Sequence, residues 1–140
     1  MRLGWLLGKR FLLICHIGAK TGLVRRTVVE VIKKDLDCDH YWVASGYGAH
    51  AHWYKNLVAT PEVTIVVGAR SLSVTACELG PEERADALVE YAANHAMPAK
   101  QLMGMLGYSV DGSDDDYRKV ARDALRMFVF KPRTVPQLRS

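Results

Sequence analysis

The stretch His16-Ile17-Gly18-Ala19-Lys20-Thr21-Gly22-Leu23-Val24-Arg25-Arg26-Thr27 joins the end of one apolar segment to the start of another. Two glycines, Gly18 and Gly22, allow the backbone to turn sharply and to approach a ligand closely. Lys20 and the adjacent Arg25 and Arg26 supply cations that suit a phosphate-bearing partner. The stretch therefore predicts either a clamp for the phosphate of a cofactor or an ordinary hairpin with basic surface residues.

This stretch differs from the phosphate-binding loop of nucleotide hydrolases. That loop needs a glycine directly before the lysine and another glycine five positions earlier. Here Ala19 precedes Lys20, and Ile14 stands at the earlier glycine position. The lysine of a true P-loop also opens a helix, whereas the β-branched residues that follow at 27–29 favour a strand. Nucleotide hydrolysis by such a loop is excluded.

Length and composition indicate one globular domain over residues 1–140, with an N-terminal arm at 1–10 and a flexible tail at 133–140. Apolar residues make up 49% and charged residues 24%, an ordinary globular balance. The net charge of +4 comes from dispersed basic residues, which argues against a nucleic-acid-binding protein. Three cysteines, Cys15, Cys38 and Cys77, form no C-x-x-C pair, so we expect a reducing, cytoplasmic environment without a disulfide framework.

No segment approaches the roughly 20 consecutive apolar residues that a membrane-spanning helix needs. The opening residues 1–7 are largely apolar but are followed by Gly8, Lys9 and Arg10. We expect a short helix or arm that closes one end of the domain, and weak contact with a membrane surface stays open as an alternative.

Apolar and β-branched runs predict six strands, at residues 11–15, 27–32, 41–45, 63–67, 72–77 and 127–130. The first run is continuous, so we expect a strand buried on both faces, and a polar turn is expected at 33–39. Helices are predicted at 52–59, from Pro81 onward, at 101–106 after an interruption by Pro98, and up to Leu125 after a polar loop at 111–116. Strands with short connections, then helices, then a closing strand describe an α+β fold: a mainly antiparallel six-stranded barrel with capping helices.

Three segments together resemble a known enzyme family. The 18–22 turn followed by Arg25 resembles Gly-Arg-Lys-Ser-Gly followed by Pro-Arg, and the run Trp53-Tyr54-Lys55-Asn56-Leu57 with Pro61 is similar to Trp-Tyr-x-Asn-Leu-x-x-x-Pro. The third segment is the strand at 72–79 running into Gly-Pro-Glu-Glu-Arg. These are motifs of the deazaflavin-dependent nitroreductases and quinone reductases. Members use coenzyme F-420 on a split β-barrel, an FMN-binding-like fold, and the resemblance covers most of the chain.

The resemblance implies that Lys20 and Arg25 hold the phosphate and acidic tail of coenzyme F-420. The cofactor-binding residues it implies are Gly18, Lys20, Thr21, Gly22, Arg25, Ser45, Gly46, Tyr47, Gly48, His52 and Trp53. For catalysis it implies Ser45, near the deazaflavin ring and the substrate, with Tyr108 and Tyr117 as substrate-facing aromatics. Two departures stand in the turn itself: Ala19 replaces an arginine of many members, and Val24 replaces a common proline.

The expected activity is transfer of a hydride from reduced F-420 to a quinone, a nitro compound or a similar planar acceptor. Hydride chemistry belongs to the cofactor, so no catalytic triad is needed. Two alternatives stay open: an FMN-dependent reductase of the same fold, and a non-catalytic carrier of a cofactor, tetrapyrrole or lipid. Split barrels often pair, so a homodimer is compatible by analogy.

The histidines and the cysteines give no stronger site. His50 and His52 are spaced like strand ligands, but no cysteine or carboxylate stands at a convincing spacing, so no metal site is expected. We expect His16 to be a core histidine with satisfied hydrogen bonds and His52 to cap a helix or line a pocket. Cys15 is expected to be a buried structural thiol.

Overall fold

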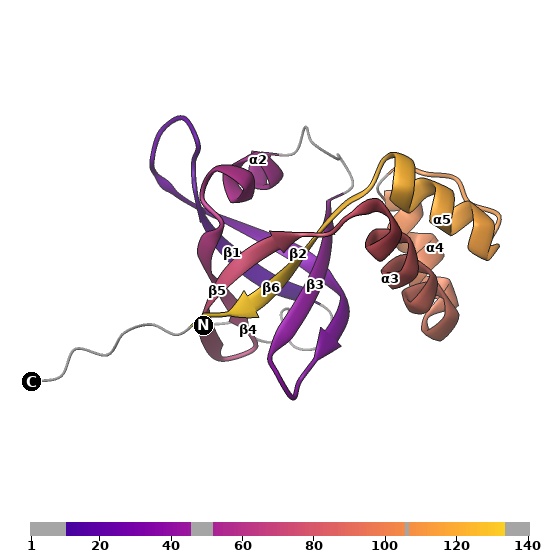
Figure 1. Ribbon diagram of the computed structural model, residues 1–140, viewed down its shortest axis with the longest axis horizontal. Helices are drawn as coiled ribbons and strands as arrows, with labels where there is room; N and C mark the ends of the chain where they lie inside the picture. The colour runs from indigo at the N-terminus through magenta and orange to yellow at the C-terminus, as the bar shows by residue number, and fades with distance from the viewer. Residues whose placement is uncertain (1–10, 46–51, 106, 134–140) are drawn as a thin grey trace, which may run out of the picture.

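The computed structural model describes residues 11–45, 52–105 and 107–133, and it forms an antiparallel barrel with helices along one side and over one end (Figure 1). Its described strands are β1 (Phe11–Ile17), β2 (Val24–Asp35), β3 (His40–Ser45), β4 (Glu62–Val67), β5 (Arg70–Glu78) and β6 (Arg126–Pro132). Its described helices are α2 (His52–Ala59), α3 (Pro81–Asn94), α4 (Ala96–Met105) and α5 (Asp114–Asp123). The strands close in the order β1-β2-β3-β6-β5-β4, which confirms the predicted barrel. Closure leaves no unpaired sheet edge along its circumference.

The barrel interior is filled by alternate residues of each strand, as the pleat of a strand requires. In β1, Leu12 and Ile14 are fully buried, while the alternating Phe11 and Leu13 are only half-buried. The predicted burial of this strand on both faces is therefore wrong, because its outward side chains are only partly covered. The interior cluster consists of Leu12, Ile14, Val29, Tyr41, Val43, Leu57, Val63, Ile65, Val74, Ala76, Phe128 and Phe130.

A second apolar cluster lies between the barrel wall and helices α3, α4 and α5, which gather on one side of the barrel (Figure 1). Strand β2 contributes to both clusters: Val29 faces the barrel interior, and Ile32, three positions later, lies on the opposite face and packs under the helices. A β-bulge between Val31 and Lys33 then shifts the register, so that Lys33 pairs with Trp42.

The predicted polar turn at 33–39 is also wrong in its start, since β2 continues to Asp35. Lys33 and Lys34 pair with Trp42 and Tyr41 of β3. The Lys33 ammonium lies 4.9 Å from the centroid of the Trp42 ring, a cation–π contact across the β2–β3 pair.

Arg84 ties helix α3 to the end of helix α5. Its side chain is 3% exposed and donates hydrogen bonds to the carbonyl oxygens of Ala121 (2.8 Å), Leu79 (3.1 Å) and Arg122 (3.0 Å). Burial lowers the pKa of this guanidinium, and Arg126 nearby adds to the effect. The last carbonyls of a helix lack partners within the helix, so a buried arginine is well suited to satisfy them.

Two helix boundaries differ from the prediction. Pro98 lies inside the first turn of α4 rather than interrupting a helix, because a first-turn proline needs no intrahelical N–H partner. Helix α5 begins at Asp114, inside the predicted loop, because the Ser113 side chain caps it by accepting from Asp116 N–H at 3.2 Å. The predicted arm at 1–10 and most of the predicted tail lie outside the described residues. No helix in the described ranges has the length and apolar character required to cross a membrane.

Candidate cofactor-binding site

A groove of about 1230 Å³ opens where helix α2 lies beside β1 and the start of β2. We call it the basic groove. Its lining residues are His16, Gly18, Ala19, Lys20, Thr21, Val24, Arg25, Arg26, Thr27, His52, Trp53, Lys55 and Asn56. Lys20, Arg25, Arg26 and Lys55 bring positive charge, and no Asp or Glu is among the described residues that line it. A concave surface with one sign of charge concentrates its field on an oppositely charged ligand.

The turn at residues 18–22 has a shape that depends on both of its glycines. Gly18 N–H donates to Leu23 O, and Gly22 N–H donates to Gly18 O, each at 2.8 Å. Gly22 has φ of 70°, a conformation that disfavours residues with a side chain. At Gly18 the constraint is space, because an added Cβ would lie 2.7 Å from Thr21 Oγ1 and 3.7 Å from Arg25 Nε. Gly18 therefore leaves room for the Thr21 hydroxyl, which accepts from Leu23 N–H at 3.2 Å within the turn.

Lys20 and Arg25, the two cations predicted to hold the coenzyme tail, line the same groove. Arg25 pairs across the ladder with His16, and Arg26 pairs with Cys15. Neighbouring strand residues point to opposite faces, so Arg25 shares the face of the buried His16 and Arg26 belongs to the outer face. Arg26 still borders the groove at its rim.

A buried hydrogen-bond chain supports the turn from below. Ala19 N–H donates to Asn56 Oδ1 at 2.9 Å, Asn56 Nδ2 lies 2.9 Å from His16 Nδ1, and His16 Nε2 lies 2.9 Å from Thr27 Oγ1. His16 is 2% exposed and Asn56 7% exposed. Burial lowers the pKa of His16, and the charge of Arg25 lowers it further. His16 is thus the satisfied core histidine that the sequence predicted.

Helix α2 contributes an aromatic wall. Trp53 borders the groove and packs against Phe128 inside the barrel, with ring centroids 6.1 Å apart. Tyr54, one position on, contacts Phe128 at 5.4 Å and donates from its hydroxyl to Glu78 Oε2 at 2.7 Å. Burial raises the pKa of Tyr54, and the bond to Glu78 adds to the rise. The ring and hydroxyl of Tyr54 thus both contact barrel residues, and Trp53 is the aromatic side chain of α2 that lies next to the groove.

The other predicted site residues are placed differently. Ser45 ends β3 opposite Arg126, is 1% exposed, and is not on the described wall of the groove. Tyr117 is buried in the cluster beneath the helices, where burial raises its pKa with further contributions from Asp111 and Asp116. Tyr108 packs against the same cluster. Gly46, Tyr47 and Gly48 lie outside the described residues. The roles of these residues stay predictions, and the burial of Tyr117 does not favour contact with a substrate.

Four groove residues, His16, Thr27, Lys55 and Asn56, were given no site role by the sequence. His16 was expected only in the core, and Lys55 and Asn56 were part of the Trp-Tyr-x-Asn-Leu run without an assigned function. A signal for Asn56 was present, since a polar amide stands directly before the fully buried Leu57 in α2. A buried amide needs hydrogen-bond partners, so its position beside Leu57 indicates a structural polar contact.

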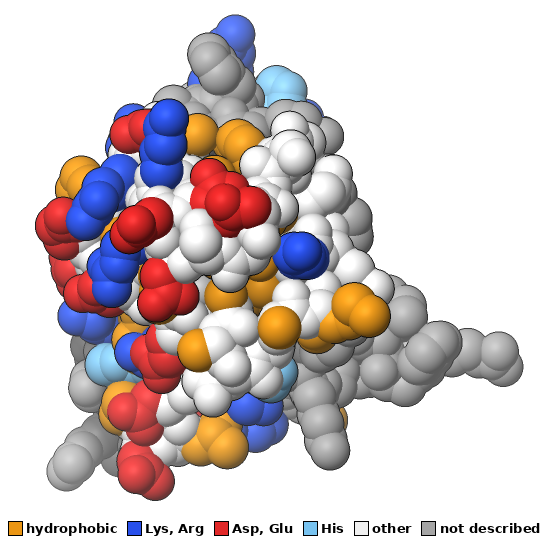
Figure 2. All heavy atoms as spheres, turned by 90° about the vertical axis from the view of Figure 1, so that its right-hand side faces the viewer, with side chains coloured by type: hydrophobic (Ala, Val, Ile, Leu, Met, Phe, Trp, Pro, Cys, Tyr) orange, Lys and Arg blue, Asp and Glu red, His pale blue; other side chains and the backbone are white. Residues whose placement is uncertain are grey.

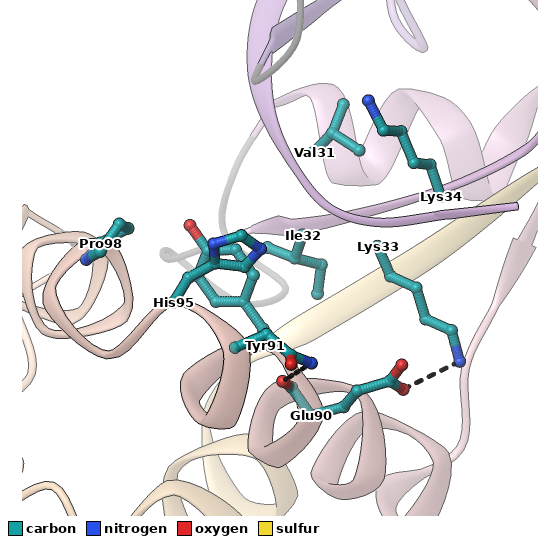
Figure 3. A pocket seen from close by; sticks show the side chains of 9 residues that line it. Val31, Ile32, Lys33, Lys34, Glu90, Tyr91, His95 and Pro98 are labelled. Atoms are coloured by element: carbon teal, nitrogen blue, oxygen red, sulfur yellow. Dashed lines mark hydrogen bonds and ion pairs between the residues drawn. The ribbon is translucent and has the colours of Figure 1, made fainter. Parts of the chain in front are cut away.

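A second hollow of about 470 Å³ lies between β2 and the end of α3, and Figure 3 shows its lining side chains. Its charges are largely neutralised. Lys33 Nζ lies 3.2 Å from Glu90 Oε2, and the Tyr91 hydroxyl donates to Glu30 Oε2 at 3.2 Å. An ion-paired lysine beside a carboxylate attracts anions weakly, so this hollow does not resemble a phosphate site. Across the described ranges, no group of three or more His, Cys, Asp or Glu side chains could hold a metal ion.

Comparison with known proteins identifies the family. The model of the F420H(2)-dependent quinone reductase family matches residues 3–103. The chain belongs to this family. It is therefore an oxidoreductase that uses reduced coenzyme F-420, and the quinone reductase resemblance read from the sequence is confirmed. No curated protein matches the chain.

Solved structures support the split-barrel fold of this F-420-dependent reductase. One is entitled an F420-H2 dependent reductase (FDR-A), with 23% identity and a TM-score of 0.60, covering 89% of this chain and 96% of the other. Another, entitled a domain-swapped dimer, has 22% identity and a TM-score of 0.59, covering 89% and 81%. A pyridoxamine 5'-phosphate oxidase-related, FMN-binding protein from Nostoc punctiforme has 8% identity and a TM-score of 0.58, covering 89% and 71%. At these identities the likeness shows the fold alone.

Proposed function

We propose that reduced F-420 binds in the basic groove, with its phosphate-bearing tail at Lys20 and Arg25 and its ring toward Trp53. The observation that carries this proposal is the placement of Lys20 and Arg25 on one groove whose described lining holds no carboxylate. A cation of the turn and a cation of β2 thus converge on one concave surface. Both kinds of cation form charge-assisted hydrogen bonds with phosphate.

The donor set fits the chemistry of the coenzyme tail. Besides the cations, the backbone N–H groups of Lys20 and Thr21 donate to no acceptor in the part of the chain that the structure describes, so they are open to an anion. Exposed backbone N–H groups in a tight turn bind anions well. Arg26 and Lys55 extend the positive surface along the groove toward the acidic groups of the tail. The volume of about 1230 Å³ exceeds that of a typical small-ligand site, which suits a long cofactor.

When bound, reduced F-420 supplies the hydride, and the protein supplies binding, orientation and exclusion of water. Trp53 offers an apolar face beside the groove, braced from behind by Phe128. Ser45 is 1% exposed and lies off the described groove lining. As a separate proposal taken from the family resemblance, the Ser45 hydroxyl would orient the acceptor oxygen by hydrogen bonding where the site extends past that lining to the end of β3. A quinone is the acceptor that the family implies, and nitro compounds of similar planar shape would use the same position.

The test is titration of the purified protein with oxidised and reduced F-420, comparing wild type with the Lys20→Ala/Arg25→Ala double variant. We expect the double variant to bind at least about a hundredfold more weakly, because each charge-assisted contact contributes roughly 1.5–3 kcal/mol. Lys33→Ala is the matched control, since Lys33 is a β2 cation outside the groove. Equal affinity of the double variant and wild type would refute the clamp.

Ser45→Ala separates binding from turnover. We expect the dissociation constant of F-420 to stay within about twofold while kcat for quinone reduction falls about tenfold, the size of one hydrogen bond. Equal loss of binding and turnover would contradict the proposed role of Ser45. Bleaching of reduced F-420 absorbance with and without quinone also tests the carrier alternative, because a carrier binds the coenzyme without turnover. A yellow preparation that releases FMN would instead support the FMN alternative.

We also propose a homodimer. Leu23 and Val28 are exposed by 60% and 48% on the β1–β2 hairpin and are not part of the groove lining, so they make an apolar surface for a second copy to cover. A relative of the same fold is entitled a domain-swapped dimer. Sedimentation equilibrium should give twice the chain mass, and Val28→Glu should shift it to the single-chain mass. A single-chain mass for wild type at all concentrations would contradict the proposal.

A reducing, cytoplasmic location is part of the proposal. Cys15, Cys38 and Cys77 are all free thiols. Free thiols are typical of proteins in reducing compartments. Cell fractionation should recover the protein with cytoplasmic markers, and recovery with the membrane fraction would favour surface association instead.

A further inference from the structure

We infer that His16 and Asn56 are positioning residues that hold the 18–22 turn in its anion-binding shape only while the His16 imidazole is neutral. Neither side chain is assigned a role by the family resemblance. The inference rests on the proposed clamp for its consequence in coenzyme binding. Its structural part, the coupling of the turn to His16, is a property of the cofactor-free protein.

The direction of each hydrogen bond follows from the backbone. Ala19 N–H can only donate, so the atom of Asn56 that faces it at 2.9 Å must be the amide oxygen. The Asn56 Nδ2 group, which can only donate, then faces His16 Nδ1 at 2.9 Å. His16 Nδ1 must therefore be an acceptor without a proton. The remaining proton of a neutral imidazole is on Nε2, where it is donated to Thr27 Oγ1 at 2.9 Å.

Thr27 completes the chain toward the groove. Its hydroxyl oxygen accepts from His16, so its own proton is left to be donated elsewhere, and Thr27 lines the basic groove. The chain thus runs from the backbone of the turn, through α2 and β1, to a hydroxyl donor of β2. It joins Ala19, Asn56, His16 and Thr27 without an unpartnered buried side-chain atom among the described residues.

Protonation of His16 breaks this chain at one fixed place. A proton on Nδ1 would face the Asn56 NH₂ group, and two donors cannot share a hydrogen bond. If the Asn56 amide turned over to offer its oxygen to His16, its NH₂ group would face Ala19 N–H instead. One side of Asn56 is unsatisfied in either arrangement, so the imidazolium and the anchored turn exclude each other.

Among the described residues, the surroundings of His16 supply no carboxylate that would offset this. The groove lining adds Arg25 and Arg26 from β2, Lys20 from the turn, and His52 and Lys55 from α2. On the other side, β4 pairs with β1 through Thr64, Ile65 and Val66, none of which is ionisable. The positive charge of Arg25 opposes a further cation on His16 and, together with burial, lowers the pKa of His16.

The experiment uses the full chain without coenzyme, labelled with nitrogen-15. We expect the His16 imidazole nitrogen shifts to be those of the Nε2-protonated tautomer at neutral pH. We also expect the protection of the Ala19 amide against hydrogen exchange, corrected for the intrinsic rate, to fall about tenfold as His16 becomes protonated. An Nδ1-protonated tautomer, or Ala19 protection that does not follow His16 titration, would overturn the inference.

Two near-isosteric variants sharpen the test. Asn56→Asp offers one carboxylate oxygen to Ala19 N–H and the other to a protonated His16 Nδ1, so the protection of Ala19 should persist at low pH. His16→Asn places an amide oxygen near the former Nδ1 position, accepts from Asn56 and cannot titrate, so protection should again be independent of pH. His40→Asn, at the start of β3 and outside the groove, is the control and should keep the wild-type pH step. A pH step that survives in both groove variants would contradict the inference.

Coenzyme binding then provides a separate readout. In wild type the dissociation constant of F-420 should rise about tenfold over the pH range in which His16 titrates, and in His16→Asn this part of the pH dependence should disappear. The protection of Ala19 N–H could follow the titration of His16 while replacing Lys20 and Arg25 leaves the affinity for F-420 unchanged. That result would refute the clamp and support the positioning network. Conversely, the Lys20 and Arg25 variants could lose affinity for F-420 while the protection of Ala19 N–H does not change as His16 titrates. That result would refute the positioning network and support the clamp.

Discussion

The basic groove and the helical side of the molecule carry similar basic residues but use them in opposite ways. On the helical side, acidic and basic side chains are interspersed (Figure 2) and form ion pairs. Arg118 pairs with Asp86 and Arg122 with Glu82, each at 2.8 Å. In the groove, the four cations Lys20, Arg25, Arg26 and Lys55 have no carboxylate partner within the described ranges. On the helical side the basic side chains therefore stabilise the fold through ion pairs, whereas in the groove they remain available to bind a ligand.

Unpaired cations that share a concave surface repel one another, so the groove costs some stability in the absence of an anion. The helical side has the opposite balance, because its charges already have partners. Variants that remove a cation should therefore act on stability in one region and on coenzyme affinity in the other. Four predictions test this contrast, beginning with the largest effect.

Arg84→Met should lower the free energy of unfolding by about 3 kcal/mol or more, because it leaves three carbonyl acceptors beneath the helices without their donor. The affinity for F-420 in the protein that remains folded should be unchanged, since Arg84 lies away from the groove lining. Urea unfolding and F-420 titration measure the two quantities.

The control for Arg84 is Arg118→Met on the same side of the molecule. It breaks an exposed ion pair, so the loss should be below about 1 kcal/mol. Equal losses for Arg84→Met and Arg118→Met would show that the three buried carbonyl contacts contribute little.

Arg25→Ala should weaken F-420 binding about tenfold more than Arg26→Ala. Arg25 shares the groove face of β2 with His16, and Arg26 belongs to the outer face. Neither change should lower stability noticeably, because neither guanidinium has an ion-pair partner in the described part of the chain. Isothermal titration with F-420 and parallel urea unfolding are the measurements, and a larger effect at Arg26 would reverse the assignment of the clamp.

Gly18→Ala and Gly22→Ala separate two reasons for a glycine in the same turn. At Gly22 the positive φ imposes a backbone strain of about 1 kcal/mol on alanine, with no neighbour within 4 Å of the added carbon. At Gly18 the added carbon meets Thr21 Oγ1 at 2.7 Å and displaces it from its hydrogen bond with Leu23 N–H. Because this changes the shape of the turn that carries Lys20, we expect Gly18→Ala to lose about fivefold more F-420 affinity, with both variants slightly destabilised, as measured by titration and thermal unfolding. Equal affinity losses would show that the space at Gly18 does not matter for binding.

The smallest expected effect is a pH dependence of stability from His16. The pKa of His16 in the folded protein lies below its ordinary value of 6.5, because burial and Arg25 disfavour the imidazolium. The unfolded chain therefore binds the proton more readily. Stability from the neutral histidine is present above pH 6.5 and is lost as the pH falls through the lowered pKa. Urea unfolding at pH 7.5 and 5 should show a smaller loss for His16→Asn than for wild type, and identical losses would argue against the burial of a neutral imidazole.

The sequence made the barrel predictable because its signals are local. Apolar and β-branched runs placed all six described strands, and helix α2 was predicted at 52–59, before Thr60 and Pro61. The errors lie where hydrogen bonds to other residues set a boundary. The continuation of β2 to Asp35 depends on its pairing with β3, and the start of α5 depends on the Ser113 cap. Of the site, the glycine turn with Lys20 and Arg25 could be found, because these residues are close together in the chain.

The sequence by itself determined the turn, its glycines, the strand pattern around it and the nearby cations, because short-range backbone preferences and side-chain spacing fix them. Only the tertiary structure decided which cations lack an ion-pair partner and so remain available to a ligand, because that depends on whether a carboxylate from another element lies next to them. It also decided the partnership of His16 with Asn56, residues 40 positions apart that meet because α2 packs beside β1. Hydrogen-bond direction in a buried chain is set by such distant neighbours, and no local pattern records it.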